Sequence, residues 1–273
     1  MKLTNRNNLK QSKDDSGLSV VSFNVLADGL AQGGGFANMD DSDLTWDKRF
    51  PLLLAEVIRS GPADLIGLAE CNHFDTHWEP EMKKLGYQGV FSPKDSAPAA
   101  RFGAPADGVA IFYRTSKCDL ITHTTFGTYP VQVIATLKIN DKTYTMSMMH
   151  LKSKHGFEIK RAKQTSAAMS RIELTDPTDH TIVCGDFNAE SDEKCVSIVS
   201  QTLKSAYGNG PDWTTWKVRK NPVKHTIDYI FYSAGLTLDT VWEIPKDEDI
   251  EEKALPNLQY GSDHIAIGAI FTT

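Results

Sequence analysis

Short apolar runs that end abruptly at a polar residue recur along the chain. The segment 18–24 (Leu-Ser-Val-Val-Ser-Phe-Asn) is rich in β-branched residues and ends at Asn24, and segment 63–70 ends in the same way at Glu70. We predict further strands at 87–91, 107–114, 119–126, 131–139, 142–150, 180–185, 226–232, 237–242 and 264–271. Short apolar or alternating runs bounded by turn residues predict β-strands. Asn140-Asp141 predicts a hairpin turn between two of them.

Other segments have apolar residues at helical spacing. In 46–60 these are Phe50, Leu53, Leu54, Val57 and Ile58, and Gly61-Pro62 follows as a stop signal. We predict further helices at 78–85, 157–172 and 193–203, and a Gly-rich loop at 29–36. Helices that alternate with several hairpins predict an α/β fold in which two sheets pack face to face beneath outer helices, rather than one parallel sheet.

The length and composition indicate one soluble globular domain. The chain has 273 residues, is 40% hydrophobic and 23% charged, and contains no linker-like stretch or membrane-length apolar run. Since α/β folds use about 250 residues around one core, we expect one domain over 18–273. The basic, acid-poor segment 1–17 is predicted to be a disordered tail. We expect a monomer that does not bind membranes.

The cysteines and the net charge restrict the compartment and the ligands. Cys71, Cys118, Cys184 and Cys195 are dispersed without a C-x-x-C pair, which favours a reducing compartment such as the cytoplasm over a disulfide framework or a zinc site. A mitochondrial targeting peptide at the basic start is the alternative. The net charge of −6 disfavours a protein that grips a long nucleic acid along its whole surface, although a local basic pocket is compatible with it.

Polar residues that a hydrophobic core would not select stand at the ends of four predicted strands. They are Asn24, Glu70, His150 and Asp186, and Asn188 follows shortly after the last. Ligands of layered α/β structures collect at the carboxyl ends of strands, so these side chains are expected to share one site. A carboxylate beside Asn and Asp oxygens suits magnesium, which keeps several waters that a phosphate can replace.

The pair Asp263-His264 completes a set that phosphoester hydrolysis requires. A carboxylate can fix the tautomer of a neighbouring imidazole, and an imidazole can activate water. Each residue alone also has a structural explanation, because a histidine at a strand end is commonly a hydrogen-bonding residue and Gly-Asp-Phe-Asn is a composition typical of turns. The prediction of a magnesium-dependent hydrolase therefore depends on the combination.

The ordered motifs resemble the endonuclease/exonuclease/phosphatase superfamily over nearly the whole chain. They are Ser-Phe-Asn24, Glu70, His150-Leu-Lys152, Cys-Gly-Asp186-Phe-Asn188, Ile-Asp228-Tyr and Ser-Asp263-His264. The resemblance implies a four-layer α/β/β/α sandwich of two mixed sheets and one Mg²⁺ site. It implies that Glu70 binds Mg²⁺ and that Asp186 and His264 position and activate the water. It further implies that Asn24, Asn188 and His150 contact the substrate, that Asp263 orients His264, and that Asp228 supports it.

Within the superfamily, the chain is similar to a branch related to poly(A) nucleases, judging from Leu-Gly-Tyr-Gln-Gly, Thr-Thr-Trp-Lys-Val-Arg and Leu-Pro-Asn. That resemblance implies a basic cluster for a terminal phosphate, formed here by Lys94, Lys152, Lys154 and Arg219. It also implies removal of the 2′-phosphate from NADP(H) to give NAD(H), with a 3′ exoribonuclease acting on RNA 3′ ends as the alternative. The branch carries arginine where this chain has Lys154, and lysine lacks the two-pronged grip of arginine. A silent binding adaptor, which would lack a metal or water-handling residue, is a third hypothesis.

Overall fold

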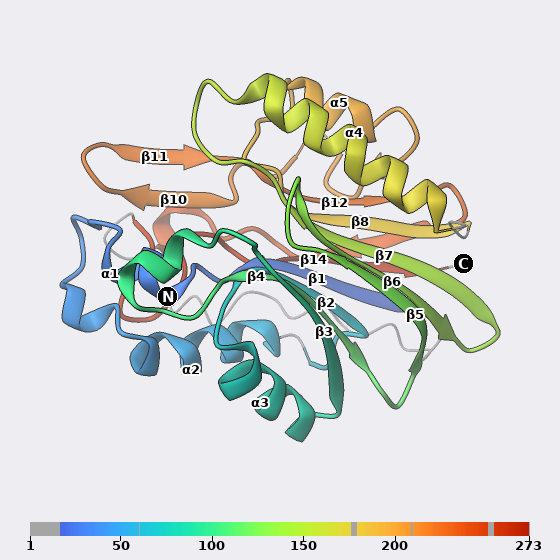
Figure 1. Cartoon of the computed structure of the whole chain (residues 1–273), viewed down its shortest axis with the longest axis horizontal. Helices are drawn as coiled ribbons and strands as arrows, with labels where there is room; N and C mark the ends of the chain where they lie inside the picture. The colour runs from blue at the N-terminus through green and yellow to red at the C-terminus, as the bar shows by residue number, and fades with distance from the viewer. Residues whose placement is uncertain (1–16, 60, 176–178, 209, 251–253, 273) are drawn as a thin grey trace.

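The computed structural model describes residues 17–59, 61–175, 179–208, 210–250 and 254–272, and it consists of two stacked mixed sheets flanked by helices (Figure 1). The first sheet has the order β13-β14-β1-β2-β4-β3, with β1 (Leu18–Asn24), β2 (Leu65–Cys71), β3 (Tyr87–Pro93), β4 (Gly108–Arg114), β13 (Thr237–Val241) and β14 (Ile267–Thr272). The second has the order β5-β6-β7-β8-β12-β9, with β5 (Cys118–Phe126), β6 (Val131–Ile139), β7 (Lys142–His150), β8 (His180–Asp186), β9 (Lys204–Ser205) and β12 (Asp228–Tyr232). The predicted four-layer sandwich is confirmed. Of the predicted tail, residues 1–16 lie outside the described residues.

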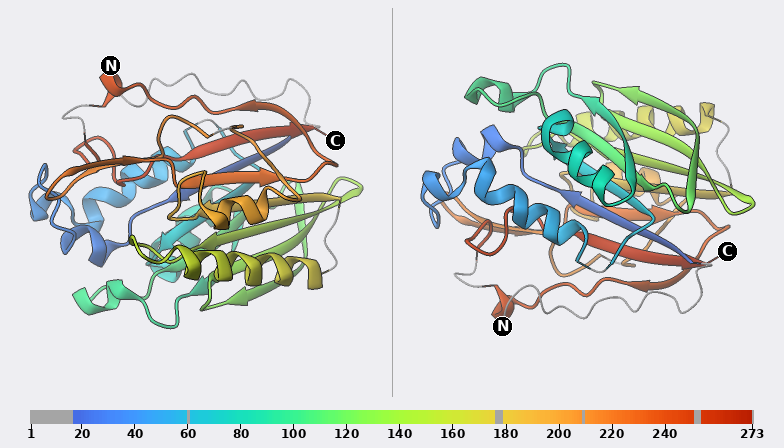
Figure 2. Two further views of the ribbon diagram at one scale, coloured as in Figure 1. Left: turned by 90° about the horizontal axis from the view of Figure 1, so that it is seen from above. Right: turned by 90° about the horizontal axis from the view of Figure 1, so that it is seen from below.

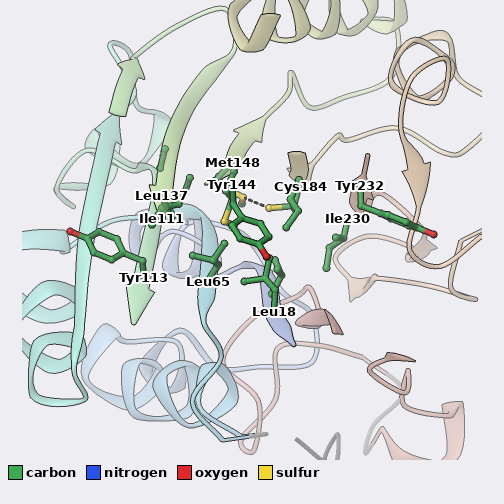
Figure 3. Packing of buried hydrophobic residues seen from close by; sticks show 14 of the residues in the cluster. Leu18, Leu65, Ile111, Tyr113, Leu137, Tyr144, Met148, Cys184, Ile230 and Tyr232 are labelled. Atoms are coloured by element: carbon green, nitrogen blue, oxygen red, sulfur yellow. Dashed lines mark hydrogen bonds between the residues drawn. The ribbon is translucent and has the colours of Figure 1, made fainter. Parts of the chain in front are cut away.

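Alternation along the strands produces the layers. On β1, Val20 points into the core between the sheets, whereas Val21 and Phe23 belong to the cluster beneath the outer helices. Figure 3 shows the core between the sheets, where Leu65 and Met148 come from opposite sheets. Helices α2 (Trp46–Val57) and α3 (Glu79–Lys84) cover one sheet, and α4 (Glu158–Leu174) and α5 (Lys194–Val199) cover the other (Figure 2). None of the helices among the described residues is long and apolar enough to span a membrane.

The strand register brings the predicted polar ends to one edge of the sandwich. Strands β1 and β2 are parallel, with Asn24 beside Ala69, and β7 and β8 are parallel, with His150 beside Asp186. Strand β12 runs antiparallel to β8 and begins with Asp228 opposite Asp186. The fold therefore collects residues that are far apart in the sequence at the same place.

Some elements differ from the sequence-based expectation. The segment predicted as a Gly-rich loop contains the short helix α1 (Asp28–Gln32), which is too brief to show a helical period. No strand was predicted in 213–225, yet β10 (Thr215–Val218) and β11 (Pro222–His225) form a separate two-stranded hairpin. Such a hairpin has no sheet face of its own to bury, so its sequence lacks a strong strand pattern.

Element boundaries also moved. Helix α5 ends at Val199 rather than at residue 203, and β14 begins at Ile267 rather than at residue 264. Residues 264–266 are buried without belonging to a named strand, because they make hydrogen bonds to the hairpin and to side chains. The correction matters for the site, since His264 lies in this irregular segment.

Candidate active site

Local backbone distortions aim the strand-end residues into the cleft. The pairing of β2 with β4 shifts between Ala69 and Cys71, and Glu70 adopts a left-handed conformation with φ of 54°. Asn188 is also left-handed, with φ of 50°. This conformation costs roughly 1–2 kcal/mol for a residue with a Cβ, and such strain is typical of functional sites. Gly185 keeps β7 and β8 close, because a Cβ there would collide with the Met149 carbonyl oxygen.

The acidic part of the site is held by amide and backbone donors. Asn24 donates from Nδ2 to Asp186 Oδ2 at 2.9 Å and to Glu70 Oε1 at 3.3 Å. The backbone N–H of Ala27 donates to the other Glu70 oxygen at 3.0 Å, and that of Asn188 donates to Asp186 Oδ1 at 2.7 Å. These contacts fix the orientation of both carboxylates.

This arrangement can hold a metal ion. Ligand atoms of Glu70, His150 and Asp186 lie within 4.8 Å of one another. Burial and the neighbouring Asp228 raise the pKa of Asp186 well above its usual value, which reflects negative charge that the protein groups do not fully balance. A divalent cation would supply the missing positive charge, and its preference for carboxylate oxygens fits Glu70 and Asp186.

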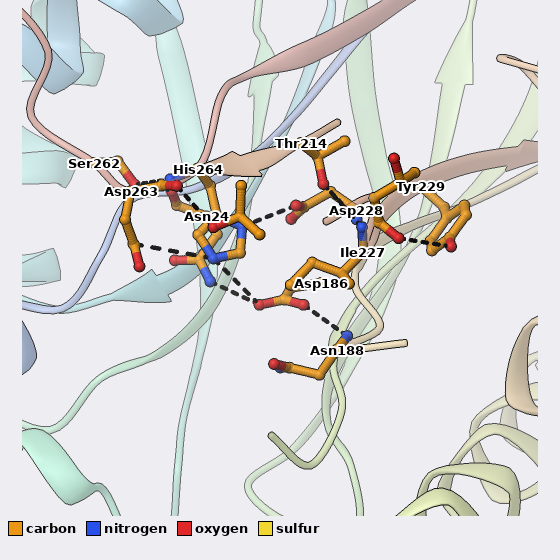
Figure 4. Close-up of polar contacts among 12 residues, drawn as sticks. Asn24, Asp186, Asn188, Thr214, Ile227, Asp228, Tyr229, Ser262, Asp263 and His264 are labelled. Carbon is orange, nitrogen blue, oxygen red and sulfur yellow. Dashed lines mark hydrogen bonds and ion pairs between the residues drawn. The ribbon is translucent and has the colours of Figure 1, made fainter. Parts of the chain in front are cut away.

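A buried histidine–aspartate pair faces the acidic cluster (Figure 4). The Nδ1 atom of His264 lies 2.8 Å from Asp228 Oδ2, and Nε2 lies 3.9 Å from Asp186 Oδ2. Burial alone would lower the pKa of His264, but the carboxylates of Asp228, Asp263 and Asp186 raise it to about 9. Asp228 therefore fixes the ring so that Nε2 faces the interior of the site.

The expected role of Asp263 needs correction. Its carboxylate lies 4.0 Å from His264 Nε2, beyond hydrogen-bond distance, and instead pairs with Lys217 Nζ at 2.9 Å. Burial would raise the pKa of Asp263, yet Lys217 and His264 lower it to about 2. The neighbour of His264 in sequence is therefore not its hydrogen-bond partner in space.

A second buried histidine, His150, lies on the other side of Asp186. Its Nε2 atom is 3.1 Å from Asn188 Nδ2 and 3.6 Å from Asp186 Oδ2. Burial, Lys94, His264 and Lys152 all lower its pKa well below the usual value. The ring is therefore neutral, and we assign the Asn188 amide as donor to Nε2. Together His150 and Asn188 form a polar wall next to the carboxylates.

The four predicted basic residues separate into two flanks. On the His150 side, Lys94 pairs with Asp107, and Lys152 has a lowered pKa because of burial and repulsion by Lys154, Lys160 and Lys94. On the Lys217 side, Arg219 stacks 4.8 Å above the Phe36 ring and helps to lower the pKa of Asp263. Because the lysines on the His150 side repel one another, an anion bound among them would be favoured.

Sequence reasoning missed several residues that shape this site. Arg161 is 2% exposed, binds Glu193, and donates to the carbonyl oxygens of Lys152 at 3.1 Å and Lys154 at 2.9 Å. Arg161 shares the buried face of α4 with Gln164 and Ala168. A charged residue on the buried face of a predicted helix could have identified it from the sequence. Lys217 and Thr214 lie at the hairpin for which no strand was predicted.

The comparisons with known proteins agree with this site. A model described as the endonuclease/exonuclease/phosphatase family matches residues 21–264. Nocturnin from Rattus norvegicus is 31% identical over 281 residues, which cover 93% of this chain and 65% of the rat protein. The chain thus spans about two thirds of that relative's length. The Ccr4 exoribonuclease subunit of the Yarrowia lipolytica CCR4-Not complex is 24% identical over 339 residues, which cover 93% of this chain and 48% of that protein.

A solved structure extends the similarity to three dimensions. The catalytic domain of human nocturnin with a bound sulfate anion superposes with a TM-score of 0.79 at 26% identity and covers 98% of this chain and 99% of that domain. The predicted resemblance to the endonuclease/exonuclease/phosphatase superfamily is confirmed, and within it the chain is similar to nocturnin. Since the family match spans residues 21–264 and so includes the whole strand-end cluster from Asn24 to His264, this chain belongs to the endonuclease/exonuclease/phosphatase family.

Proposed function

We propose that this chain is a magnesium-dependent phosphatase that removes the 2′-phosphate of NADP(H) and yields NAD(H). The observation that carries the proposal is the meeting of three groups at one sheet edge. These are an acidic cluster with unbalanced charge, the His264–Asp228 pair, and lysines beside His150. A phosphoester hydrolase requires an activated water, a counter-charge for the phosphoryl oxygens and relief of charge on the leaving oxygen.

The protein side chains divide this work. Glu70 and Asp186 would hold Mg²⁺, which when bound offsets charge on the phosphoryl and leaving oxygens. The 3.9 Å between Asp186 Oδ2 and His264 Nε2 is a separation that one water can bridge. A water held there attacks phosphorus and gives its proton to Asp186, while the bond between phosphorus and the 2′ oxygen breaks and that oxygen takes a proton from solvent to leave as a hydroxyl group. Asn188 and His150 line the adjacent wall, where the nonbridging phosphoryl oxygens bind.

The choice of a dinucleotide is supported by the scale and sign of the basic region. The net charge is −6, and the lysines and arginine near the site occupy two short flanks. Proteins that bind along an RNA strand usually have an extended basic groove with stacking aromatic rings. A protein that binds one terminal phosphate needs only a compact group of cations. The nocturnin catalytic domain, the structural relative, binds a sulfate anion.

A second candidate is a 3′ exoribonuclease that acts on poly(A). It is supported by the relative from Yarrowia lipolytica, which is a 3′-5′-exoribonuclease subunit. The same attacking water and the same carboxylates would serve a phosphodiester, so the candidates differ only in what occupies the cleft beyond the reacting phosphate.

The deciding experiment supplies both substrates to the purified chain with Mg²⁺. We expect phosphate release from NADPH without shortening of an oligo(A) strand, and shortening alone would favour the second candidate. Glu70→Ala is expected to abolish hydrolysis while the protein stays folded by circular dichroism. Glu173→Ala, at an exposed position of α4, is the matched control and should retain activity. Full activity of Glu70→Ala would refute the metal assignment.

A further inference from the structure

Thr214 lies between the hairpin and the two segments that carry Asp228 and His264, and its side chain is fully buried (Figure 4). Its hydroxyl oxygen accepts hydrogen bonds from the backbone N–H groups of Ile227 at 2.9 Å and Asp228 at 3.1 Å. Its carbonyl oxygen accepts from the N–H of Ile265 at 2.8 Å, immediately after His264. Thr214 thus contacts the backbone of the segment that carries Asp228 and also that of the segment that carries His264.

The hydroxyl replaces a missing strand neighbour. Strand β12 pairs with β8 from Asp228 onward, but on its other edge β9 reaches only Phe231 and Tyr232. Among the described residues, the first residues of β12 therefore have no neighbouring strand on that edge, and a buried N–H without an acceptor is strongly unfavourable. A hydroxyl oxygen has two lone pairs and can satisfy two donors at once.

We infer that Thr214 is a positioning residue, whose hydroxyl sets the place of Asp228 and, through it, the orientation of the His264 ring. The inference rests on the proposed function, because it concerns the pair that would activate the water. Displacement of the first residue of β12 changes the contact between Asp228 Oδ2 and His264 Nδ1, which is 2.8 Å in this structure. The carbonyl link to Ile265 does not depend on the side chain, so the hydroxyl acts mainly on the Asp228 side.

The variant that isolates this effect is Thr214→Val, which keeps the branched shape and removes the acceptor. We expect kcat for NADPH to fall on the order of tenfold with KM nearly unchanged, because ground-state contacts to the substrate are untouched. Thr214→Ser restores an acceptor and should recover most of kcat. The matched control is Thr145→Val in β7, since the Thr145 hydroxyl is buried and has no hydrogen-bond partner among the described residues.

A double-mutant cycle separates positioning from a merely structural role. In an Asp228→Asn background, Thr214→Val should change kcat by less than about twofold, because residues that act as one unit are not additive. A full tenfold effect in that background, or failure of Thr214→Ser to recover activity, would overturn the inference. If Thr214→Val does not fold, the comparison of Thr214→Ser with Thr214→Ala decides the same question.

A readout without turnover keeps this inference distinct from the proposed function. Nuclear magnetic resonance of the His264 ring nitrogens in the full chain should show altered chemical shifts in Thr214→Val, but not in Thr214→Ser or Thr145→Val. Unchanged His264 signals in Thr214→Val would reject the positioning role. Inactivity of the wild-type chain toward both NADPH and oligo(A) would instead overturn the proposed function, whatever the resonance result.

Discussion

The site contains two buried histidines on opposite sides of Asp186, and beyond that shared carboxylate lysines act on one ring and further carboxylates on the other. His264 is 3% exposed and faces the carboxylates of Asp228, Asp263 and Asp186, whereas His150 is 8% exposed and faces Lys94 and Lys152. Burial favours the neutral form of both rings, yet the pKa of His264 is raised to about 9 and that of His150 is lowered well below its usual value. Neighbouring charge, rather than burial, therefore distinguishes the side of the site that we propose for water activation from the side that we propose for phosphate binding.

The largest effects are expected when each of the two histidines is replaced in turn. His264→Gln is expected to lower kcat for NADPH by about 10³-fold with little change in KM, because it removes the proton-handling imidazole. His150→Gln keeps a polar group against the phosphate wall and should cost only about tenfold. Steady-state kinetics on the purified variants measures both effects. Equal losses would show that the two sides do not differ in role.

The carboxylates around His264 can also be tested by measuring the stability of the folded protein. Lys217→Met leaves the carboxylate of Asp263 buried without its 2.9 Å partner and should destabilise the fold by about 3 kcal/mol in urea denaturation at neutral pH. Lys220→Met, at an exposed position of the same hairpin, is the control and is expected to be nearly neutral. A similar stability for both variants would argue that the Asp263–Lys217 pair contributes nothing.

The pH dependence of this pair has a definite sign. Since the folded-state pKa of Asp263 is lowered from 3.8 to about 2, its ionised form stabilises the native state. That contribution is fully present above about pH 4 and is lost as the pH falls toward 2. Denaturation curves between these values should show a steeper loss for the wild type than for Lys217→Met. Parallel curves would contradict the assignment.

The lysines beside His150 are expected to contribute to substrate affinity. Lys152→Gln removes an ammonium group near His150 and should raise KM for NADPH by about tenfold, with a smaller effect on kcat. Lys163→Gln, at an exposed position further along α4, provides the control. A change in kcat alone would move Lys152 from phosphate binding to the chemical step.

The smallest expected effect is at Lys154, whose left-handed backbone has φ of 84° and whose carbonyl oxygen is held by Arg161. Lys154→Arg supplies a planar, two-pronged donor and should lower KM about two- to threefold without changing kcat. Steady-state kinetics at low ionic strength gives the greatest sensitivity, because salt screens such exposed charges. An unchanged or higher KM would show that Lys154 does not contact the phosphate.

Much of this site could be predicted because strand ends are local features. The runs ending at Asn24, His150 and Asp186 coincide with the ends of β1, β7 and β8, and Glu70 lies one residue before the end of β2. The roles within the site were less accessible. Adjacency suggested Asp263 as the partner of His264, but the carboxylate that accepts the hydrogen bond is Asp228, 36 residues away in sequence. The roles of Thr214 and Arg161 were overlooked because both include hydrogen bonds to backbone atoms of distant segments, which residue types in a sequence do not reveal.

The sequence by itself determined the alternation of strands and helices, the sandwich fold, and the order of polar residues at the strand ends. These features depend on the spacing of apolar residues and on residue type, both of which can be read directly from the sequence. Only the tertiary structure decided which carboxylate holds which imidazole, which histidine is neutral, and that the basic residues form two flanks. Those properties arise from distances of a few ångströms between segments far apart in sequence, where burial strengthens every charge–charge interaction.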